Sequence, residues 1–172
     1  MSASEQATVA AARYRMQQFI RALGARPGHA DLAQARSLLS EPHWRLFRQM
    51  APRDQQHAIE TLRLIGMEGA PSPDLALAAL LHDAGKGYVR LHERVLFVLL
   101  ALWPRLLWRL SAEHGPHWRA ALWRSARHAE TGARLAAETG ASARVADLIR
   151  RHHTRAADDR ELRALIEADA RA

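Results

Sequence analysis

Apolar side chains recur every three or four positions along most of the chain, and no stretch alternates convincingly at every second position. This spacing is typical of helices that bury one face, so the sequence predicts an all-α fold. Residues 72–74 (Ser-Pro-Asp) are a strong helix start, because they supply a cap, a proline in the first turn and an acidic residue near the N-terminus of the helix. Helices are expected at residues 5–23, 27–39, from Pro42, from Pro52, at 73–82, at 128–139, after Ser142, and through Asp169.

The length of 172 residues suits one domain with a substantial core, and 48% hydrophobic and 25% charged residues are typical of a globular protein. We expect a single helical domain over residues 1–172. It would comprise N-terminal helices in residues 1–50 and a functional core in residues 52–172, with an apolar insertion at residues 90–115. The chain has no cysteine, so any bound metal must use histidine and carboxylate ligands.

The formal net charge of +7 would suit an anionic partner. The basic residues are scattered over most of the expected helices rather than grouped, so they do not indicate a dedicated nucleic-acid partner. Residues 1–18 include charged side chains and no apolar core segment. No signal peptide is therefore expected, and a cytoplasmic location is the default.

Residues 95–110 (VLFVLLALWPRLLWRL) are unusually apolar. The stretch is too short, and too interrupted by a proline and two arginines, to span a bilayer. Three interpretations stay open: a pair of core or lid helices, a homodimer face, or a peripheral membrane contact anchored by Trp103, Trp108 and arginines. Burial in a core or dimer is the commoner fate of such a stretch.

In three separate expected helices, the last position of the apolar stripe is occupied by a titratable residue. His82, His152 and Asp169 each occupy the position where the next apolar side chain would point inward. One such residue is usually a satisfied polar group of the core, because an unpaired buried carboxylate is costly. Three such residues are better explained if they converge on shared cations. Three further candidate ligands would join them: His57, Asp83 and His128.

The chain has a single lysine, Lys86, among 25 basic residues, and it follows the His82-Asp83 pair in the sequence HDAGK. A chain so biased to arginine that keeps an ammonium group here suggests that a compact point charge matters at this position. Gly85 is expected to let the backbone turn sharply and bring Lys86 back over the His-Asp pair.

Taken in order, these residues resemble the ligand pattern of the HD-domain metal-dependent phosphohydrolase superfamily: His57, His82-Asp83, His128, His152-His153 and Asp169. The local resemblance is nearest to the HD-GYP branch, which has an HDxGK element, a later histidine that opens a helix, an HH pair and a terminal aspartate. It covers residues 52–172. The Gly-Tyr-Pro segment that this branch uses for cyclic dinucleotides is absent, because residues 154–158 read TRAAD. Hydrolysis of cyclic di-GMP is therefore not favoured.

The resemblance implies an HD-domain helical bundle with a buried His/Asp site for two divalent ions, such as Fe, Mn, Zn or Mg. The implied ligands of the first ion are His57, His82, Asp83 and Asp169; those of the second are Asp83, His128, His152 and His153. The implied catalytic groups are Asp83, as the bridge between the ions, and Lys86, as a clamp on a phosphate oxygen. Since adjacent residues cannot share one stripe without a distortion at the helix end, one of His152 and His153 is expected to bind metal and the other substrate.

The expected function is hydrolysis of a nucleotide or another phosphate ester by metal-activated water. Two alternatives stay open: a di-iron oxygenase of the HD type, and a non-catalytic regulatory or membrane-associated module stabilised by metal. Tyr88, Arg90 and Arg94 are expected to be solvated rather than in contact with substrate. Four further histidines lie outside this pattern and, as surface or locally paired residues, need no functional role: His43, His92, His114 and His117.

Overall fold

The computed structural model describes residues 26–154 and 158–172, and every regular element in those residues is a helix. The predicted all-α fold is therefore confirmed, while the helix expected at residues 5–23 lies outside the described residues. In chain order the elements are α2 (His29–Leu38), α3 (Glu41–Arg48), α4 (Pro52–Glu68), α5 (Pro73–Leu81), the 3₁₀ turn η1 (Ala84–Lys86), α6 (Leu91–Leu100), α7 (Pro104–Leu110), α8 (His117–Glu138), α9 (Ala143–Arg151) and α10 (Arg160–Arg171).

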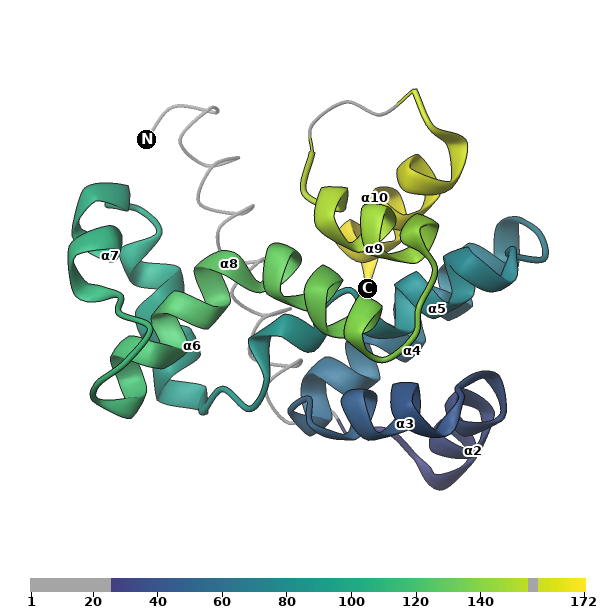
Figure 1. Cartoon of the computed structure of the whole chain (residues 1–172), viewed down its shortest axis with the longest axis horizontal. Coiled ribbons are helices and arrows are strands. Elements are labelled where there is room, and N and C mark those ends of the chain that lie inside the picture. Colours follow the sequence, from purple (N-terminus) through teal and green to yellow (C-terminus); the bar gives the residue numbers. More distant parts are fainter. Residues whose placement is uncertain (1–25, 155–157) are drawn as a thin grey trace, which may run out of the picture.

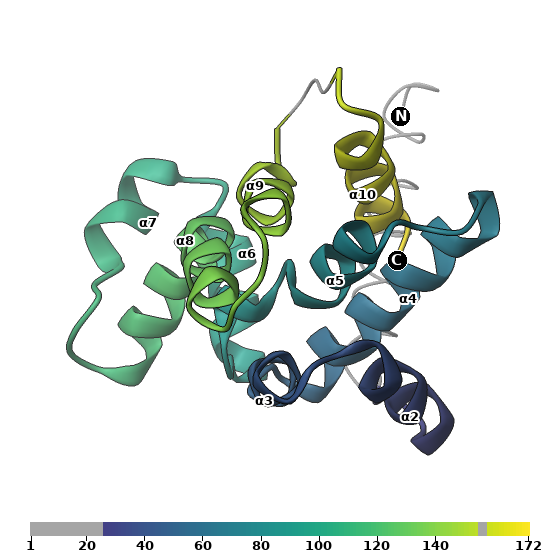
Figure 2. The ribbon, with the colours of Figure 1, turned by 45° about the vertical axis from the view of Figure 1, so that its right-hand side comes forward.

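Helix α5 lies at the centre of the main core. It is short and apolar on all sides, and its residues 78–81 are completely buried. Helices α2, α3, α4, α9 and α10 all contact it, and Figure 2 shows it enclosed by these neighbours. A helix that is hydrophobic all round is stable only when other elements cover every side. The position of α5 therefore places its C-terminal residue pair, His82-Asp83, inside the molecule.

Two predicted helix starts are confirmed. The hydroxyl of Ser72 accepts a hydrogen bond from the backbone N–H of Leu75, and Pro73 is the first residue of α5. The hydroxyl of Ser142 accepts in the same way from the backbone N–H of Val145, at the start of α9. Each bond satisfies an amide that has no partner within the helix, so these local signals fix where the two helices begin.

The helix predicted to open at His128 begins instead at His117, so His128 lies in its middle. Pro116 occupies the position before the first helical residue, and a continuous buried stripe runs from Ala121 along α8 past His128 to Ala136. The prediction was wrong because the Gly-Pro pair at 115–116 ends one segment and also starts the next.

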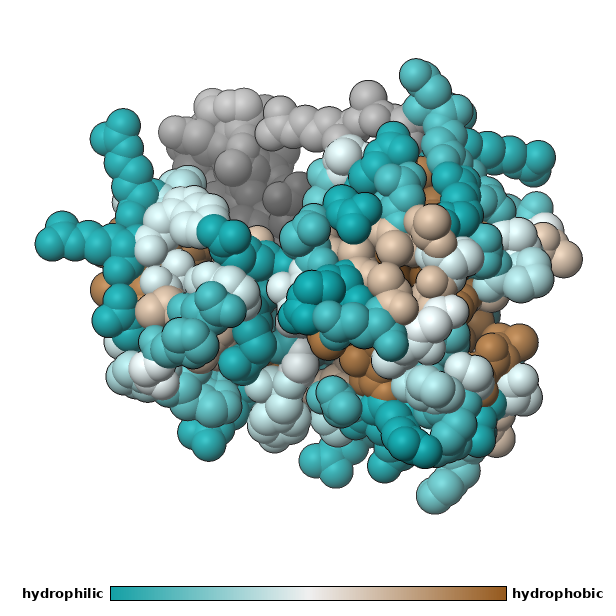
Figure 3. All heavy atoms as spheres, in the orientation of Figure 1, coloured by the Kyte–Doolittle hydropathy of each residue, from teal (hydrophilic) through white to brown (hydrophobic). Residues whose placement is uncertain are grey.

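The apolar stretch at residues 95–110 is divided between two helices, α6 and α7, which turn at Pro104. With the start of α8 they form one end of the molecule (Figure 1). A small second core holds them together, built from Leu100, Leu107 and Leu122. Long hydrophilic side chains extend outward from this end (Figure 3).

Gly85 is required for a close approach between backbones, not for the turn that its position predicts. Its φ is not among the positive values, which among nearby residues occur at Gly87. A Cβ atom at Gly85 would lie 2.1 Å from the carbonyl oxygen of His128 and 2.5 Å from the amide nitrogen of Gly132. Neither atom can move without displacing α8, so only glycine lets η1 lie against that helix.

Replacing Gly85 by alanine should therefore separate η1 from α8 and lower the free energy of unfolding by about 2–4 kcal/mol. Urea unfolding of the purified variants measures this. Gly66→Ala is the matched control, because a Cβ there meets no atom within 4 Å. In the interior of α4 it should raise stability by about 0.5–1 kcal/mol. Equal stability of Gly85→Ala and the parent chain would contradict the inferred contact.

Candidate metal centre

The structure brings together all seven residues that the sequence singles out as metal ligands. They come from five parts of the fold: α4, the α5–η1 junction, α8, the end of α9, and α10. Three groups of side chains place their ligand atoms within 4.8 Å of one another: His57, His82 and Asp83; His82, His152 and Asp169; and His128, His152 and His153. His82 and His152 each belong to two of these groups, so the groups form one continuous cluster.

Three histidines of the cluster are oriented in the same way. In each, Nδ1 donates a hydrogen bond to the backbone carbonyl three residues earlier, at 2.9, 2.8 and 2.6 Å for His82, His128 and His152. A carbonyl oxygen can only accept, so Nδ1 carries the proton and Nε2 keeps its lone pair in the neutral ring. In histidines that bind a metal through Nε2, the other ring nitrogen, Nδ1, typically donates to a carbonyl group in this way and fixes the orientation of the ring.

Two of these Nε2 atoms, in His82 and His152, are buried without a hydrogen-bond partner. The Nε2 of His82 lies 3.2 Å from Oδ1 of Asp169. With the neutral ring, this contact sets a nitrogen lone pair against a carboxylate oxygen, which is unfavourable unless a proton or a metal ion lies between them. Buried polar atoms are nearly always satisfied, so these two nitrogens indicate a site for a cation.

Asp83 lies between the two ends of the cluster, and its side chain is 2% exposed. Its Oδ1 is 3.4 Å from Nε2 of His128, whereas its Oδ2 is 3.8 Å from Nε2 of His82. Lys86 also contacts Oδ2, with its Nζ at 2.5 Å. One oxygen therefore faces each group of histidines, which is the arrangement that a carboxylate needs to bind two cations at once.

Asp169 closes the cluster from the last helix. Its Oδ1 lies 2.8 Å from Nε2 of His57, although the two residues are 112 positions apart in the chain. Both side chains are partly exposed, at 19% for Asp169 and 25% for His57. This side of the cluster therefore reaches solvent, as His153 does at the other end.

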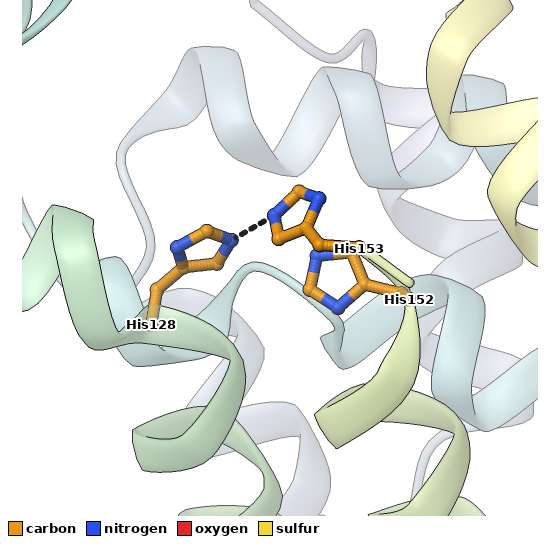
Figure 4. Close-up of side chains that lie close together, drawn as sticks. All are labelled: His128, His152 and His153. Atoms are coloured by element: carbon orange, nitrogen blue, oxygen red, sulfur yellow. Dashed lines mark hydrogen bonds between the residues drawn. The ribbon is translucent and has the colours of Figure 1, made fainter. Parts of the chain in front are cut away.

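His152 and His153 both reach the cluster because α9 ends at Arg151. His152 follows as the residue after the helix and points inward, whereas His153 is exposed and approaches from the next turn. The Nε2 of His153 lies 2.9 Å from Nε2 of His128, as Figure 4 shows by the dashed line. Two adjacent histidines were expected to need a distortion at the helix end to reach one site. The end of α9 at Arg151 provides it, because His152 and His153 lie beyond the last helical residue.

The electrostatic surroundings prepare these groups for metal binding near neutral pH. Burial, followed by the charge of Lys86, lowers the pKa of His128 to about 4. Burial and the neighbouring histidines lower the pKa of His152 to about 3. Burial disfavours the charged form of Asp83, but Lys86, His82 and His128 outweigh it and hold its pKa well below the usual value. For His82 the two aspartates outweigh burial and raise the pKa. Most ligand atoms are thus already deprotonated at pH 7.

Some charged side chains of α4, α6 and α8 form pairs that the sequence did not indicate. Arg94, expected to be solvated, donates to the buried Asp54 at 2.6 Å. The expectation for Arg94 was wrong because the two residues are 40 positions apart and no local pattern links them. His117 likewise pairs with the buried Glu93. Of these residues, only Glu93 has a signal in the sequence: it is the third residue of α6, and its side chain accepts a hydrogen bond from the backbone N–H of Arg90 at the start of that helix.

The all-α fold and the buried His/Asp cluster together define a helical domain with a candidate metal centre. The family model for the HD domain matches residues 55–172, and the chain belongs to this family. HD domains form a superfamily of metal-dependent phosphohydrolases in which some members are not catalytic. The match does not assign the HD-GYP branch. No curated protein and no solved structure matches the chain.

The metal-free protein should lose stability as the pH falls from about 6.5 toward 4. Below the ordinary histidine pKa of 6.5 the unfolded chain binds protons at His128 and His152, while the folded chain keeps both neutral until about pH 4 and 3. The lowered pKa values of His43 and His153 act in the same sense, whereas His82, with its raised pKa, acts in the opposite sense. We expect a net loss of about 2 kcal/mol in the free energy of unfolding between roughly pH 7 and pH 5.

Urea unfolding in the presence of EDTA measures this dependence. His152→Asn removes one of the histidines with a lowered pKa and should make the slope of stability with pH shallower. His29→Asn, at an exposed position at the start of α2, is the control and should leave the slope unchanged. Stability that stays level or rises as the pH falls over this range would contradict the expected linkage.

Proposed function

We propose that the chain is a phosphohydrolase that uses two divalent ions to hydrolyse a nucleotide or another phosphate ester. The observation that carries the proposal is the position of Asp83, whose two carboxylate oxygens face different groups of histidines. Membership of the HD-domain family supports the same function. A cyclic dinucleotide is not part of the proposal, because the chain lacks the Gly-Tyr-Pro segment.

The donor set fits divalent ions such as Mn, Fe or Zn, since it combines imidazole nitrogens with carboxylate oxygens and contains no thiolate. Metal binding would also give partners to the buried Nε2 atoms of His82 and His152. The proposed ligands of one ion are His57, His82, Asp83 and Asp169; those of the other are Asp83, His128, His152 and His153. A pair of such ions, when bound, lowers the pKa of a coordinated water and polarises a phosphoryl oxygen.

The chain's own contribution is orientation. The carbonyl groups that accept from Nδ1 hold His82, His128 and His152 with their free nitrogens already directed into the cluster. These three rings would then not have to reorient when an ion binds, which lowers the cost of forming the centre. His57 and Asp169 are partly exposed, so a substrate would reach the ions from their side.

Lys86 is the proposed phosphate contact. Its side chain is 18% exposed and its ammonium group pairs with Oδ2 of Asp83. Cations bound at Asp83 would share that carboxylate's negative charge, so Lys86 could instead bind a non-bridging phosphate oxygen and offset the charge that develops during hydrolysis. His153, exposed beside His128, is the second proposed contact for substrate.

Asp83→Asn tests the bridging role, because it keeps the shape of the side chain and removes its charge. We expect the second ion to be lost, together with turnover of phosphoesters. Elemental analysis of freshly purified protein and a screen of phosphoesters and nucleotides measure both effects. Asp147→Asn is the control: this carboxylate pairs with Arg151 on the same helix and lies outside the cluster. Full metal content and activity in Asp83→Asn would show that Asp83 is not the bridge.

Lys86→Met tests the phosphate contact, since it keeps much of the apolar stem and removes the ammonium group. Metal content should stay intact while turnover falls by about 10²–10³-fold, as expected for the loss of one preorganised charge. The loss should fall mainly on kcat, because the contact strengthens as charge develops. An unchanged kcat would remove Lys86 from the proposed mechanism.

The same preparations separate hydrolysis from dioxygen chemistry. Manganese-loaded protein should hydrolyse a phosphoester under anaerobic conditions. Activity that requires both iron and dioxygen would replace the hydrolase with the di-iron oxygenase. A protein that binds metal and turns over neither class of substrate would favour the non-catalytic alternative.

A further inference from the structure

Hydrophobic side chains are concentrated on the outside of helices α6 and α7. Six of them, each between 43% and 70% exposed, define what we call the α6–α7 surface: Leu91, Val98, Leu99, Leu102, Trp103 and Leu106. A hollow of about 470 Å³ lies at the turn between the two helices, lined in part by Leu102, Trp103 and Leu106. Exposed apolar surface that is grouped in this way marks an interaction site rather than ordinary surface composition.

Helix α6 is apolar on both sides, and only one side is covered. Its inner side packs through Leu96, Phe97 and Leu100 into the small core that it shares with α7 and α8. On the outer side, Leu91, Val98 and Leu99 are about half exposed, so the residues that the structure describes do not bury them. Residues 95–100 of α6 are all apolar, and a helix that is hydrophobic all round is normally covered all round, so the outer side of α6 calls for a partner outside the described residues.

The charged side chains within residues 95–112 are all of one sign. Residues 95–112 contain two exposed arginines, Arg105 and Arg109, and no aspartate or glutamate. Trp108, which is 55% exposed, adds an amphipathic ring at the edge, and Arg127 of α8 lies over it at 5.1 Å from the ring centroid. An apolar face bordered by arginine and tryptophan matches the boundary between the headgroups and acyl chains of an anionic lipid layer.

A second copy of the chain fits this surface less well. A two-fold dimer would bring Arg105 and Arg109 of both copies toward one another, and residues 95–112 supply no carboxylate to pair with them. Anionic lipid headgroups provide the missing negative charge. Within the described residues no helix is long and apolar enough to cross a membrane, so the contact that fits is peripheral.

We propose that the α6–α7 surface docks the protein on the surface of an anionic lipid membrane. Leu99, Leu102 and Leu106 enter the outer part of the acyl layer, while Arg105 and Arg109 remain among the headgroups. The proposal rests on exposed side chains of α6 and α7 alone and does not depend on the proposed hydrolase function.

Flotation of the full chain with vesicles tests the proposal. We expect the protein to float with vesicles of phosphatidylcholine mixed with phosphatidylglycerol, and to float less with phosphatidylcholine alone or at high salt. The variant Leu99→Ser/Leu102→Ser/Leu106→Ser should reduce partitioning by about tenfold or more. Arg105→Glu/Arg109→Glu should abolish the preference for the anionic vesicles.

Leu38→Ser/Met67→Ser is the matched control, because these side chains are as exposed but lie on α2 and α4. It should float like the parent chain, and all variants should keep the same metal content and unfolding midpoint. Flotation of the triple serine variant equal to that of the parent would overturn the proposal. A second result would also overturn it: a parent chain that never floats and is a dimer by light scattering, together with a triple serine variant that is a monomer. The surface would then be a homodimer interface.

Discussion

Asp83 carries its charge in a position that water hardly reaches, and the surrounding side chains are arranged to compensate that charge. An isolated carboxylate there would destabilise the fold by several kcal/mol. Lys86 balances one oxygen directly, and His82 and His128 lie close to the two oxygens. Because these partners come from the end of α5, from η1 and from α8, the compensation of one buried charge links three elements of the fold.

The distance between Asp83 and His128 depends on how closely two backbones approach. Gly85 of η1 lies against α8 at His128 and Gly132, where a side chain on either glycine would meet backbone atoms of the other element. Helix α8 also packs along α9, which ends at Arg151, directly before His152. A shift of η1 away from α8 would therefore move Asp83 relative to both histidines at once. The geometry of the candidate metal centre is set by this packing of glycines more than by any single hydrogen bond.

The parts of the fold that could be predicted from the sequence are those with local causes. Ser72 and Ser142 cap their helices through bonds to residues three positions away, and the apolar stripes of three helices identified His82, His152 and Asp169 as pointing inward. The start of α8 was missed, since one Gly-Pro pair serves both an ending and a beginning. Contacts across the chain had no local signal: the Arg94–Asp54 pair and the direction of each Asp83 oxygen depend on how α4, α6 and α8 come together. The family resemblance, rather than any spacing, supplied the expected chemistry.

The choice of lysine at position 86 follows from the same geometry. Every other basic residue of the chain is arginine, whose planar guanidinium tends to bind both oxygens of a carboxylate at once. Such a pair would hold Oδ1 of Asp83 as well as Oδ2, and Oδ1 would no longer face His128. The ammonium of Lys86 is compact and contacts Oδ2 alone, at 2.5 Å, so Oδ1 stays directed at His128 of α8. Lysine thus compensates the buried charge while Oδ1 stays free to act as a ligand and Oδ2 still faces His82.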